Sequence, residues 1–224
     1  KKIVTIKKKA NSGDNLAKKE LIILEKLLIS LSDEIPARAI EIEKDDFTVV
    51  KSLQLLTLKP ILYICNVEEN SASVGNLHSL NVNEFAKANS AKCLIISAVI
   101  EEEISKFENL EDINMFLNDL GLDEPGLHKI IKVGYRLLNL ITFYTVGPKE
   151  AHAWTVTEGS IAPQAAGKIH SDFEKGFIRA EIISYDDYVK CGGEQASKEA
   201  GKMRVEGKTY IINDSDIINV LFNI

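Results

Sequence analysis

The sequence has few cysteines and no long apolar run. Its three cysteines, Cys65, Cys93 and Cys191, lie far apart and form no CxxC or mixed Cys/His spacing, which argues against a disulfide scaffold and a cysteine-based zinc site. Cys65 and Cys93 lie inside apolar runs, so we expect buried, reduced thiols in a cytoplasmic protein. No window approaches the roughly 18 apolar residues of a membrane-spanning helix, and we expect no membrane partner.

The chain also has no initiating methionine and no signal-type apolar segment after Lys1, so we expect a fragment or a processed product. It contains no internal repeat and no low-complexity stretch. The 224 residues allow one large domain or two small ones, and the 45% apolar content is enough for a substantial core. Charged residues make up 27% of the chain, which argues against disorder.

The net charge of −6 argues against a generally basic nucleic-acid-binding protein, and we expect no DNA partner. The charge is uneven along the chain: it is +3 over residues 1–60, −6 over 61–145 and −3 over 146–224. A cluster of lysines near the start supplies the positive excess: Lys1, Lys2, Lys7, Lys8 and Lys9. Such a cluster can contact a phosphate backbone, but it is also typical of the solvated start of a helix.

Apolar spacing predicts helices over the first quarter of the chain. Residues 1–31 contain two helical pieces, and Asp14 is a good N-cap for the second, in which leucines recur at three- and four-residue steps. A further helix is predicted over Asp45–Leu56, and we expect a coiled-coil-like helical hairpin. The apolar side of that further helix consists of Phe47, Val50, Leu53 and Leu56.

The next part of the chain predicts a parallel sheet. The apolar runs Ile61–Cys65 and Cys93–Ile96 are typical of strands buried on both faces, and a helix over Leu77–Ala88 separates them. Strand, helix and strand within about 35 residues form a βαβ unit, which implies parallel strands and a right-handed crossover. Further helices are predicted over Glu101–Leu120 and Gly126–Leu138.

From about Leu140 the sequence predicts a small β-grasp domain, in which two strands, a helix and three strands follow one another. The expected strands are Leu140–Val146, Ala151–Thr157, Phe177–Ser184, Lys208–Asn213 and Ile217–Phe222, and the expected helix is Ala162–Lys175. We expect seven residues in the core: Trp154, Phe173, Ile178, Ile182, Ile212, Val220 and Phe222.

The polar loop after the first buried strand carries the sharpest local signal, Asn66-Val67-Glu68-Glu69. Open α/β sheets bind ligands at this end of their strands. Guanine-specific P-loop proteins have NKxD in this loop, where the aspartate accepts hydrogen bonds from N1–H and the 2-amino group of guanine. Here Val67 replaces the lysine and the longer Glu69 replaces the aspartate. Adenine lacks both donors, so this change is compatible with ATP.

A plain polar connection between strand and helix remains the alternative for this loop. The same holds for Ser97-Ala98 after the second strand, where small residues would let backbone N–H groups approach a base edge. Neither pattern is specific by itself.

Two further patterns are predicted to be structural. Gly207-Lys208-Thr209 resembles the end of a P-loop, but five residues separate Gly201 from Gly207 where the motif requires four, and strand-like residues follow, so we expect a β-turn. His170-Ser171-Asp172 is predicted to cap a helix. None of the four histidines has ligand or nucleophile spacing, so we expect no metal site and no catalytic residue among His78, His128, His152 and His170.

Several blocks of the sequence resemble the YchF/Obg-like ATPase family. The run from Gly147 to Gly176, GPKEAHAWTVTEGSIAPQAAGKIHSDFEKG, is similar to the TGS domain of that family. Upstream, LQLLTLKPILYICNVEE (Leu53–Glu69) resembles the family's entry into its base-recognition loop, and NDLGLDEPGL (Asn118–Leu127) resembles its stretch before the TGS domain. The similarity extends over essentially the whole chain and includes Phe177–Glu181, Tyr185–Asp187, Lys198–Lys202 and Asp216–Asn223.

The resemblance implies an α/β and α+β multidomain protein. Residues 1–58 would be most of a helical hairpin, residues 59–139 the C-terminal half of a P-loop G domain, and residues 140–224 a β-grasp TGS domain. It also implies a cytoplasmic, ribosome-associated protein that binds and hydrolyses ATP in preference to GTP, with Mg²⁺ bound beside the nucleotide. Base recognition is carried over to the residues that match the family's N-x-x-E motif and the adjoining loop: Asn66, Val67, Glu69, Ser97 and Ala98.

The family's P-loop, Mg²⁺ ligand and switch segments have no counterpart in these 224 residues, so we expect the chain alone to be inactive as an ATPase. A second hypothesis is a nucleotide-independent module in which the hairpin and the TGS domain bind ribosomal RNA or protein. The expected contacts are basic: Lys7, Lys8, Lys9, Lys149, His152, Lys168, Arg179 and Lys190. The −3 charge of residues 146–224 argues against strong electrostatic attraction of this part of the chain to RNA phosphates. A third possibility is that the hairpin only spaces the two domains.

Overall fold

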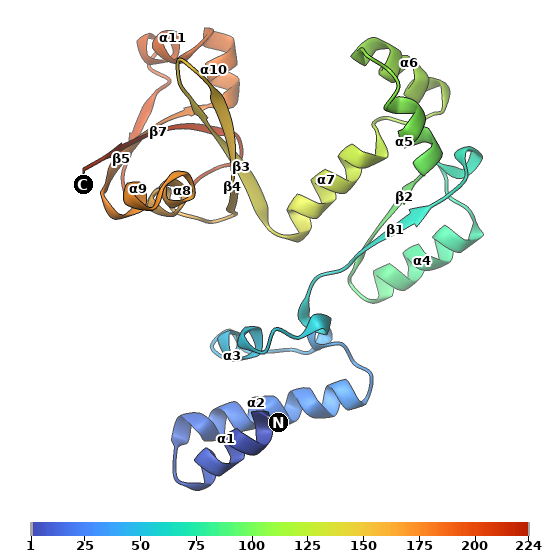
Figure 1. Ribbon diagram of the computed structural model, residues 1–224, viewed down its shortest axis with the longest axis vertical. Helices are drawn as coiled ribbons and strands as arrows, with labels where there is room; N and C mark the ends of the chain where they lie inside the picture. Colours follow the sequence, from blue (N-terminus) through green and yellow to red (C-terminus); the bar gives the residue numbers. More distant parts are fainter. Residues whose placement is uncertain (1, 224) are drawn as a thin grey trace. The chain divides into compact units, whose positions relative to one another are not determined.

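The computed structural model describes residues 2–223 and divides into two compact units, the first ending at Lys129 and the second beginning at Ile130 (Figure 1). The first unit contains a pair of parallel strands with helices, and the second contains a five-stranded sheet. Every helix among the described residues is too short or too polar to span a bilayer.

The first unit begins with a helical hairpin of α1 (Lys2–Asn11) and α2 (Asn15–Ser32). Asp14 is the N-cap of α2, as predicted: its Oδ1 accepts hydrogen bonds from the backbone N–H of Leu16 at 2.9 Å and of Ala17 at 3.1 Å. The two helices pack through a small apolar core of Ile6, Ala10, Ala17 and Leu24.

The predicted helix Asp45–Leu56 is wrong as an arm of the hairpin, since α1 takes that place against α2. Only α3 (Phe47–Ser52) is helical in this segment, and it ends because Gln54 adopts a left-handed backbone with φ of 50°. Val50 is buried with Ile23 and Leu27 of α2, whereas Leu56 is 79% exposed. Two 3₁₀ turns flank α3: η1 (Ala37–Ala39) and η2 (Leu56–Leu58).

The predicted βαβ unit is confirmed. β1 (Leu62–Asn66) and β2 (Lys92–Ile96) pair in parallel, and α4 (Leu77–Ala88) connects them. The α4 helix begins in a capping box, in which Asn76 Oδ1 accepts from the Ser79 N–H at 3.0 Å and Ser79 Oγ accepts from the Asn76 N–H at 2.8 Å.

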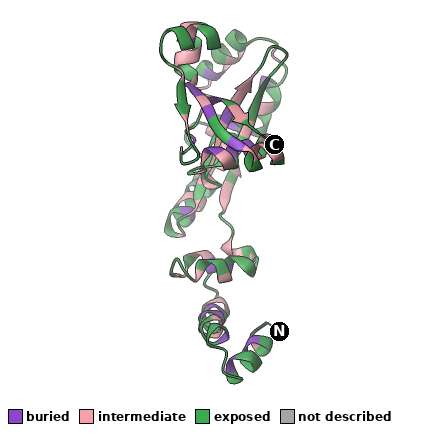
Figure 2. Cartoon of the chain, turned by 90° about the vertical axis from the view of Figure 1, so that its left-hand side faces the viewer, coloured by how far each residue is buried: buried purple, intermediate pink, exposed green. Residues whose placement is uncertain are grey.

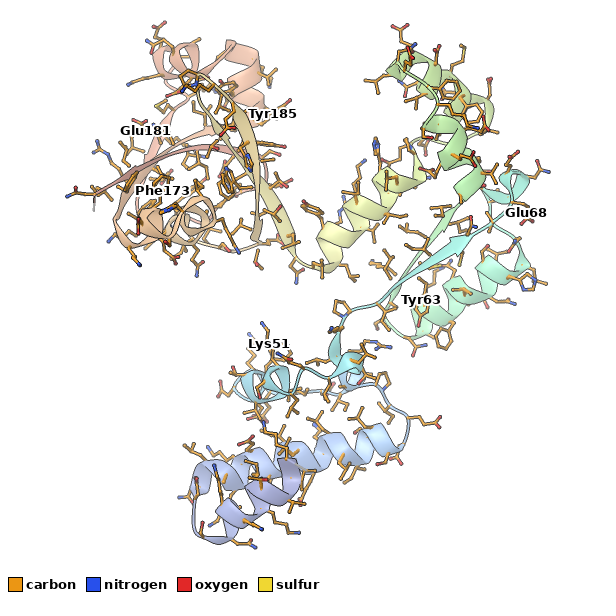
Figure 3. The ribbon with its side chains drawn as sticks, in the orientation of Figure 1. Lys51, Tyr63, Glu68, Phe173, Glu181 and Tyr185 are labelled. Atoms are coloured by element: carbon orange, nitrogen blue, oxygen red, sulfur yellow. The ribbon has the colours of Figure 1, made fainter. Side chains whose placement is uncertain are left out.

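Burial of β1 on both faces is a prediction that the structure contradicts. Tyr63 packs edge-on against Phe85 of α4, with 6.0 Å between the ring centroids (Figure 3). Ile64, which points to the opposite face, is 45% exposed. Among the described residues only two strands form this sheet, and α4 covers one side of it.

Three helices lie between β2 and the first strand of the second sheet in the sequence: α5 (Ala98–Ile104), α6 (Leu110–Asp119) and α7 (Gly126–Leu137). The single helix predicted over Glu101–Leu120 is therefore wrong. It is interrupted because Asn109 starts a new helix, its Oδ1 accepting from the Asp112 N–H at 2.8 Å. Ile100, Ile104 and Leu117 are buried together between α5 and α6.

The second unit is a mixed five-stranded sheet with the strand order β4-β3-β7-β5-β6. Its strands are β3 (Leu140–Val146), β4 (Ala151–Thr157), β5 (Phe177–Ser184), β6 (Arg204–Glu206) and β7 (Asp216–Phe222). Its helices are α8 (Ala162–Ile169), α9 (Ser171–Lys175), α10 (Tyr185–Cys191) and α11 (Glu194–Glu199). The core lies between the sheet and α8 and includes Phe143, Val156, Ala165 and Ile182; Figure 2 shows buried positions along these strands.

Three details of this unit differ from expectation. The predicted strand Lys208–Asn213 is a loop, and β6 provides the strand instead. The predicted helix Ala162–Lys175 is divided at His170, whose extended backbone ends α8 and begins α9. Ile178 is 55% exposed, because the pairing of β5 with β7 is irregular between Phe177 and Arg179. Phe222 is 37% exposed, and it is the last residue of β7.

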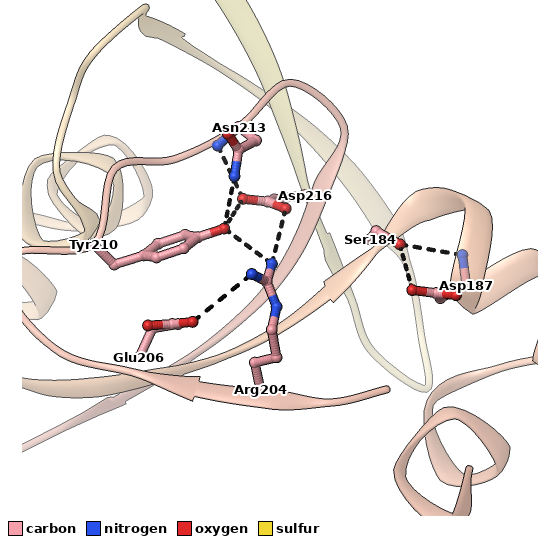
Figure 4. Close-up of polar contacts among 7 residues, drawn as sticks. All are labelled: Ser184, Asp187, Arg204, Glu206, Tyr210, Asn213 and Asp216. Carbon is pink, nitrogen blue, oxygen red and sulfur yellow. Dashed lines mark hydrogen bonds and ion pairs between the residues drawn. The ribbon is translucent and has the colours of Figure 1, made fainter. Parts of the chain in front are cut away.

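A polar network accounts for the loop that replaces the predicted strand. The Tyr210 hydroxyl donates to Asp216 Oδ2 at 2.9 Å, and the Asn213 N–H donates to the same oxygen at 2.9 Å (Figure 4). Arg204 donates to the Tyr210 hydroxyl at 3.1 Å and stacks over its ring. The loop is therefore fixed by side chains to the buried Asp216 at the start of β7, and its backbone makes only a single antiparallel bridge, between Ile211 and Ile161.

Candidate functional site

Two loops meet at the carboxyl ends of β1 and β2. Asn66 Oδ1 accepts a hydrogen bond from the Ala98 N–H at 2.9 Å, and the Val67 N–H donates to Ile96 O at 2.9 Å. The parallel pairing of the two strands places both loops at one edge of the sheet. Asn66, Val67, Ser97 and Ala98, which were singled out from the sequence, are therefore brought together.

The side chains of these residues differ in what they offer to a ligand. Val67 is 7% exposed, so its side chain packs beneath the loop. It is therefore not available to stack on a base as the stem of an exposed lysine would be. Ser97 is 3% exposed, and its Oγ has no hydrogen-bond partner in the described part of the chain. A buried hydroxyl without a partner is costly, which makes this oxygen a candidate to bind a polar ligand atom.

Two neighbouring carboxylates in the first loop have different surroundings. Glu68 is labelled in Figure 3. Its Oε1 accepts from Ser71 Oγ at 3.0 Å, and its Oε2 accepts from Asn76 Nδ2 at 3.2 Å. Its own backbone N–H, followed by the Ser71 hydroxyl, lowers the pKa of Glu68. Glu69 is exposed at the start of the 3₁₀ turn η3 (Glu69–Ser71). Sequence reasoning missed the role of Glu68, although the Glu-x-x-Ser spacing was visible.

The helix that begins at the second loop, α5, contacts the start of α7. Glu101, on the first turn of α5, accepts from the Gly126 N–H at 2.7 Å and from the Leu127 N–H at 3.0 Å. A carboxylate at this position satisfies two free donors at the start of α7 and interacts favourably with the helix dipole. Gly126 is required here because an added Cβ would lie 2.8 Å from Glu101 Oε1. The turn at Ser97-Ala98 is thus held between Asn66 and α7.

Comparison with known proteins identifies the family. The chain is 48% identical over 222 residues to the ribosome-binding ATPase YchF of Haemophilus ducreyi and 44% identical over 226 residues to that of Bacillus subtilis. These matches cover 99% and 100% of this chain, and a family model named YchF-GTPase_C, described as a protein of unknown function, matches residues 140–223. The chain belongs to the YchF family.

The structural relatives agree with this assignment. The YchF GTPase of Schizosaccharomyces pombe superposes with a TM-score of 0.82 at 33% identity over 92% of this chain and 55% of that one. A GTP-binding protein from Pyrococcus horikoshii shares the fold, with a TM-score of 0.55 at 19% identity. The predicted mixed α/β class is confirmed. The chain spans 61% of the Haemophilus relative and 62% of the Bacillus relative.

The basic residues predicted to contact RNA lie on several elements of the two units of this YchF-family chain. Lys7, Lys8 and Lys9 are exposed on α1, in the first unit. In the second unit, His152 on β4 and Arg179 on β5 lie three strands apart, which is about 14 Å across a sheet. The remaining three lie on other elements: Lys149 before β4, Lys168 on α8 and Lys190 on α10.

The other sequence patterns have structural roles. Gly207-Lys208-Thr209 forms a turn, in which the Tyr210 N–H donates to Gly207 O at 3.2 Å, so it is not a phosphate loop. The His170 side chain accepts from the Asp172 N–H at 3.2 Å, which confirms the predicted cap. The described residues contain no group of three or more His, Cys, Asp or Glu side chains placed to hold a metal ion.

Cys65 and Cys93 are free thiols on adjacent strands, with 3.7 Å between their sulfur atoms, and both are half-buried rather than buried as predicted. Burial, together with the neighbouring Cys65 thiol, raises the pKa of Cys93 to about 11. An ordinary thiol has a pKa of about 8.5, so at about pH 8 Cys93 is expected to react with iodoacetamide on the order of 100-fold more slowly. Mass spectrometry of the Cys93 peptide measures this rate. Equal rates in the folded and the urea-unfolded chain would contradict the prediction.

Proposed function

We propose that the Asn66–Glu69 loop, together with Ser97 and Ala98, binds the adenine ring of ATP. We further propose that the whole protein hydrolyses ATP in preference to GTP, binds Mg²⁺ with the nucleotide and associates with ribosomes in the cytoplasm. The relatives that carry the name ribosome-binding ATPase support this reading. The division into residues 1–58, 59–139 and 140–224 belongs to the same proposal.

The buried, unpartnered Ser97 hydroxyl beside the Asn66–Ala98 hydrogen bond carries the proposal. Adenine presents the N6 amino group as a donor and ring nitrogens as acceptors, so a serine hydroxyl can pair with either kind of atom. The exposed Glu69 carboxylate would pair with N1–H and the 2-amino group of guanine only if it occupied the position that the carboxylate of a shorter aspartate takes. Its extra methylene displaces the carboxylate, which removes the preference for guanine.

Phosphate binding is assigned to a part of the protein outside these 224 residues. Phosphoryl transfer depends mostly on electrostatic stabilisation of the β- and γ-phosphates by backbone N–H groups, a lysine and Mg²⁺. None of the described residues forms such a loop, since Gly207-Lys208-Thr209 precedes no helix. The role of this chain in the reaction is then to hold and select the base, which positions the triphosphate for groups supplied elsewhere.

The experiment compares ATP and GTP affinity in the whole protein. Glu69→Asp combined with Val67→Lys is expected to raise GTP affinity relative to ATP about tenfold, because the shorter carboxylate regains both guanine donors. Glu84→Asp is the matched control, since Glu84 is exposed on α4 away from the loop. An unchanged base preference in the double variant would refute the role of this loop in base recognition.

The 224-residue chain alone is expected to show no steady-state ATP hydrolysis, and turnover by it would refute the assignment of phosphate binding.

A second candidate function is favoured by the charge of the α1–α2 hairpin. Lys18 and Lys19, at the start of α2, are exposed like the three lysines at the end of α1, so five lysines flank one turn. We propose that this end contacts ribosomal RNA. Ribosome co-sedimentation across a salt series tests it: alanine at Lys7, Lys8 and Lys9 should flatten the salt dependence, whereas alanine at Lys44, Lys51 and Lys59 should not. Binding insensitive to salt would exclude an electrostatic contact.

A further inference from the structure

The two edges of the five-stranded sheet are built differently. β6, at one edge, is three residues long and carries Arg204 and Glu206. β4, at the other edge, is seven residues long, and its sequence AHAWTVT contains no charge, no proline and no glycine. Its pairing with β3 is continuous, without a bulge. Charges, short length and bulges are the usual protection of an edge against further pairing, and β4 has none of them.

The backbone groups that β4 leaves free follow from the hydrogen bonds of β3. The Thr142 N–H donates to Asp214 Oδ1 at 2.8 Å, and Thr142 O accepts from the Ser215 N–H at 2.7 Å. Both backbone groups of Thr142 therefore point away from β4. Its partner across the strands, Thr155, is therefore a non-hydrogen-bonded position of this pair. Because the pattern alternates, Ala151, Ala153 and Thr155 direct their N–H and C=O groups outward, and all three residues are exposed.

Hydrogen bonds at the two ends of the β3–β4 pair fix the same alternation. The Glu158 N–H donates to Asn139 O at 2.8 Å, and the Gly147 N–H donates to Glu150 O at 2.9 Å. The backbone N–H and C=O groups of the even-numbered residues of β4 thus point toward β3, and those of the odd-numbered residues point outward from the sheet edge. Three consecutive outward residues form a row of alternating donors and acceptors, which only another extended backbone can match.

We propose that β4 pairs antiparallel with β4 of a second copy of this chain, in the register centred on Ala153. Ala153 then faces Ala153 of the partner, and Ala151 faces Thr155, so six backbone hydrogen bonds form and every outward group of these residues is satisfied. In the same register His152 lies opposite Trp154 of the partner. Within one chain these two rings already lie 4.2 Å apart, so the pairing extends an aromatic contact across the interface.

Other symmetric registers are less favourable. Centring on Trp154 would set Glu150 opposite Glu158, two like charges. Centring on Thr155 would require Thr157 O, which accepts from the Ser160 N–H at 3.1 Å. The Ala153 register avoids both conflicts, and the uncharged strand meets no repulsion from its own copy. Self-complementarity thus favours a second copy over an unrelated strand.

Cysteine cross-linking tests the register in the full 224-residue chain. Residues facing each other in a hydrogen-bonded pair have Cα atoms about 5.5 Å apart, within the range of a disulfide. Ala153→Cys is expected to form a dimer under mild oxidation, identified by the cross-linked peptide in mass spectrometry. Ala151→Cys alone should not, because its copies lie more than about 13 Å apart, but a mixture with Thr155→Cys should. Cross-linking of Ala151→Cys with itself, or none at Ala153→Cys, would overturn the register.

Sedimentation velocity over a concentration series tests the dimer itself. Ala153→Pro removes two of the six hydrogen bonds without touching the β3 ladder, and is expected to weaken self-association about tenfold. Unchanged far-UV circular dichroism would show that the variant is folded. If it is not, Ala153→Lys and Ala153→Glu decide: each alone should be monomeric and their mixture should dimerise. A wild-type chain that stays monomeric at all concentrations, or dimers unaffected by these changes, would overturn the proposal.

Discussion

Replacing Asp216 with alanine is expected to lower the free energy of unfolding of the second unit by about 3 kcal/mol. Asp216 is 2% exposed, and its carboxylate accepts hydrogen bonds from Tyr210 and from the Asn213 backbone. Arg204 Nη2 lies 4.0 Å from its other oxygen. Removing the carboxylate leaves these donors without their acceptor and deprives Arg204 of its counter-charge (Figure 4).

Urea unfolding followed by fluorescence measures this loss, because the single tryptophan, Trp154, lies in the second unit. Asp216→Asn keeps one acceptor oxygen and should lose only about half as much stability. Glu206→Gln is the matched control: its carboxylate lies 3.8 Å from Arg204 at the sheet edge, and a partly exposed pair of this kind contributes less than about 1 kcal/mol. Equal effects of Asp216→Ala and Glu206→Gln would contradict a buried network.

The same network explains one failure of sequence reasoning. Tyr210-Ile211-Ile212 has the composition of a strand, whereas the strand that forms, Arg204-Val205-Glu206, has one strand-favouring residue between two charges. The structure holds Tyr210 by its hydroxyl to Asp216, six residues later, and the segment pairs through only one bridge, Ile211 with Ile161, instead of forming a strand. An apolar pattern predicts burial, and Ile212 is indeed buried, but it cannot reveal that a distant carboxylate competes with strand pairing.

Elements whose signal is local were predicted well. β3, β4 and β5 have the predicted bounds, because each segment is rich in β-branched or aromatic residues and ends at or within two residues of Gly or Ser. The start of α2 followed from Asp14, whose cap needs only the next three residues. The failure at Asp45–Leu56 arose because the chain offered two partners for α2, and periodicity does not distinguish them.

The candidate site was predictable only in part. Residues at the ends of β1 and β2 were expected at one sheet edge, and the Asn66–Ala98 hydrogen bond agrees with that arrangement. The sequence could not show that Val67 is buried or that the Ser97 hydroxyl lacks a partner, because both depend on packing between segments about 30 residues apart.

Gly75→Ala is expected to destabilise the first unit by about 3 kcal/mol. Gly75 has φ of +83°, which costs an alanine about 1 kcal/mol. Its added Cβ would also lie 2.6 Å from Ser79 Oγ and 2.8 Å from Ile95 Cδ1. Ser79 cannot yield without cost, because its hydroxyl accepts from the Asn76 N–H in the capping box that starts α4.

Gly13→Ala separates the two causes, because Gly13 has a similar φ of +99° in the α1–α2 turn but no atom within 4 Å of an added Cβ. It should cost only the backbone term of about 1 kcal/mol, so the difference between the variants measures the steric conflict at Ser79. Far-UV circular dichroism follows unfolding of the first unit, while Trp154 fluorescence should stay unchanged in both variants. Equal destabilisation by the two substitutions would show that the capping box yields freely. In that case the loop from Glu68 to Asn76, which leads from the proposed base site into α4, would not be held by packing at Gly75.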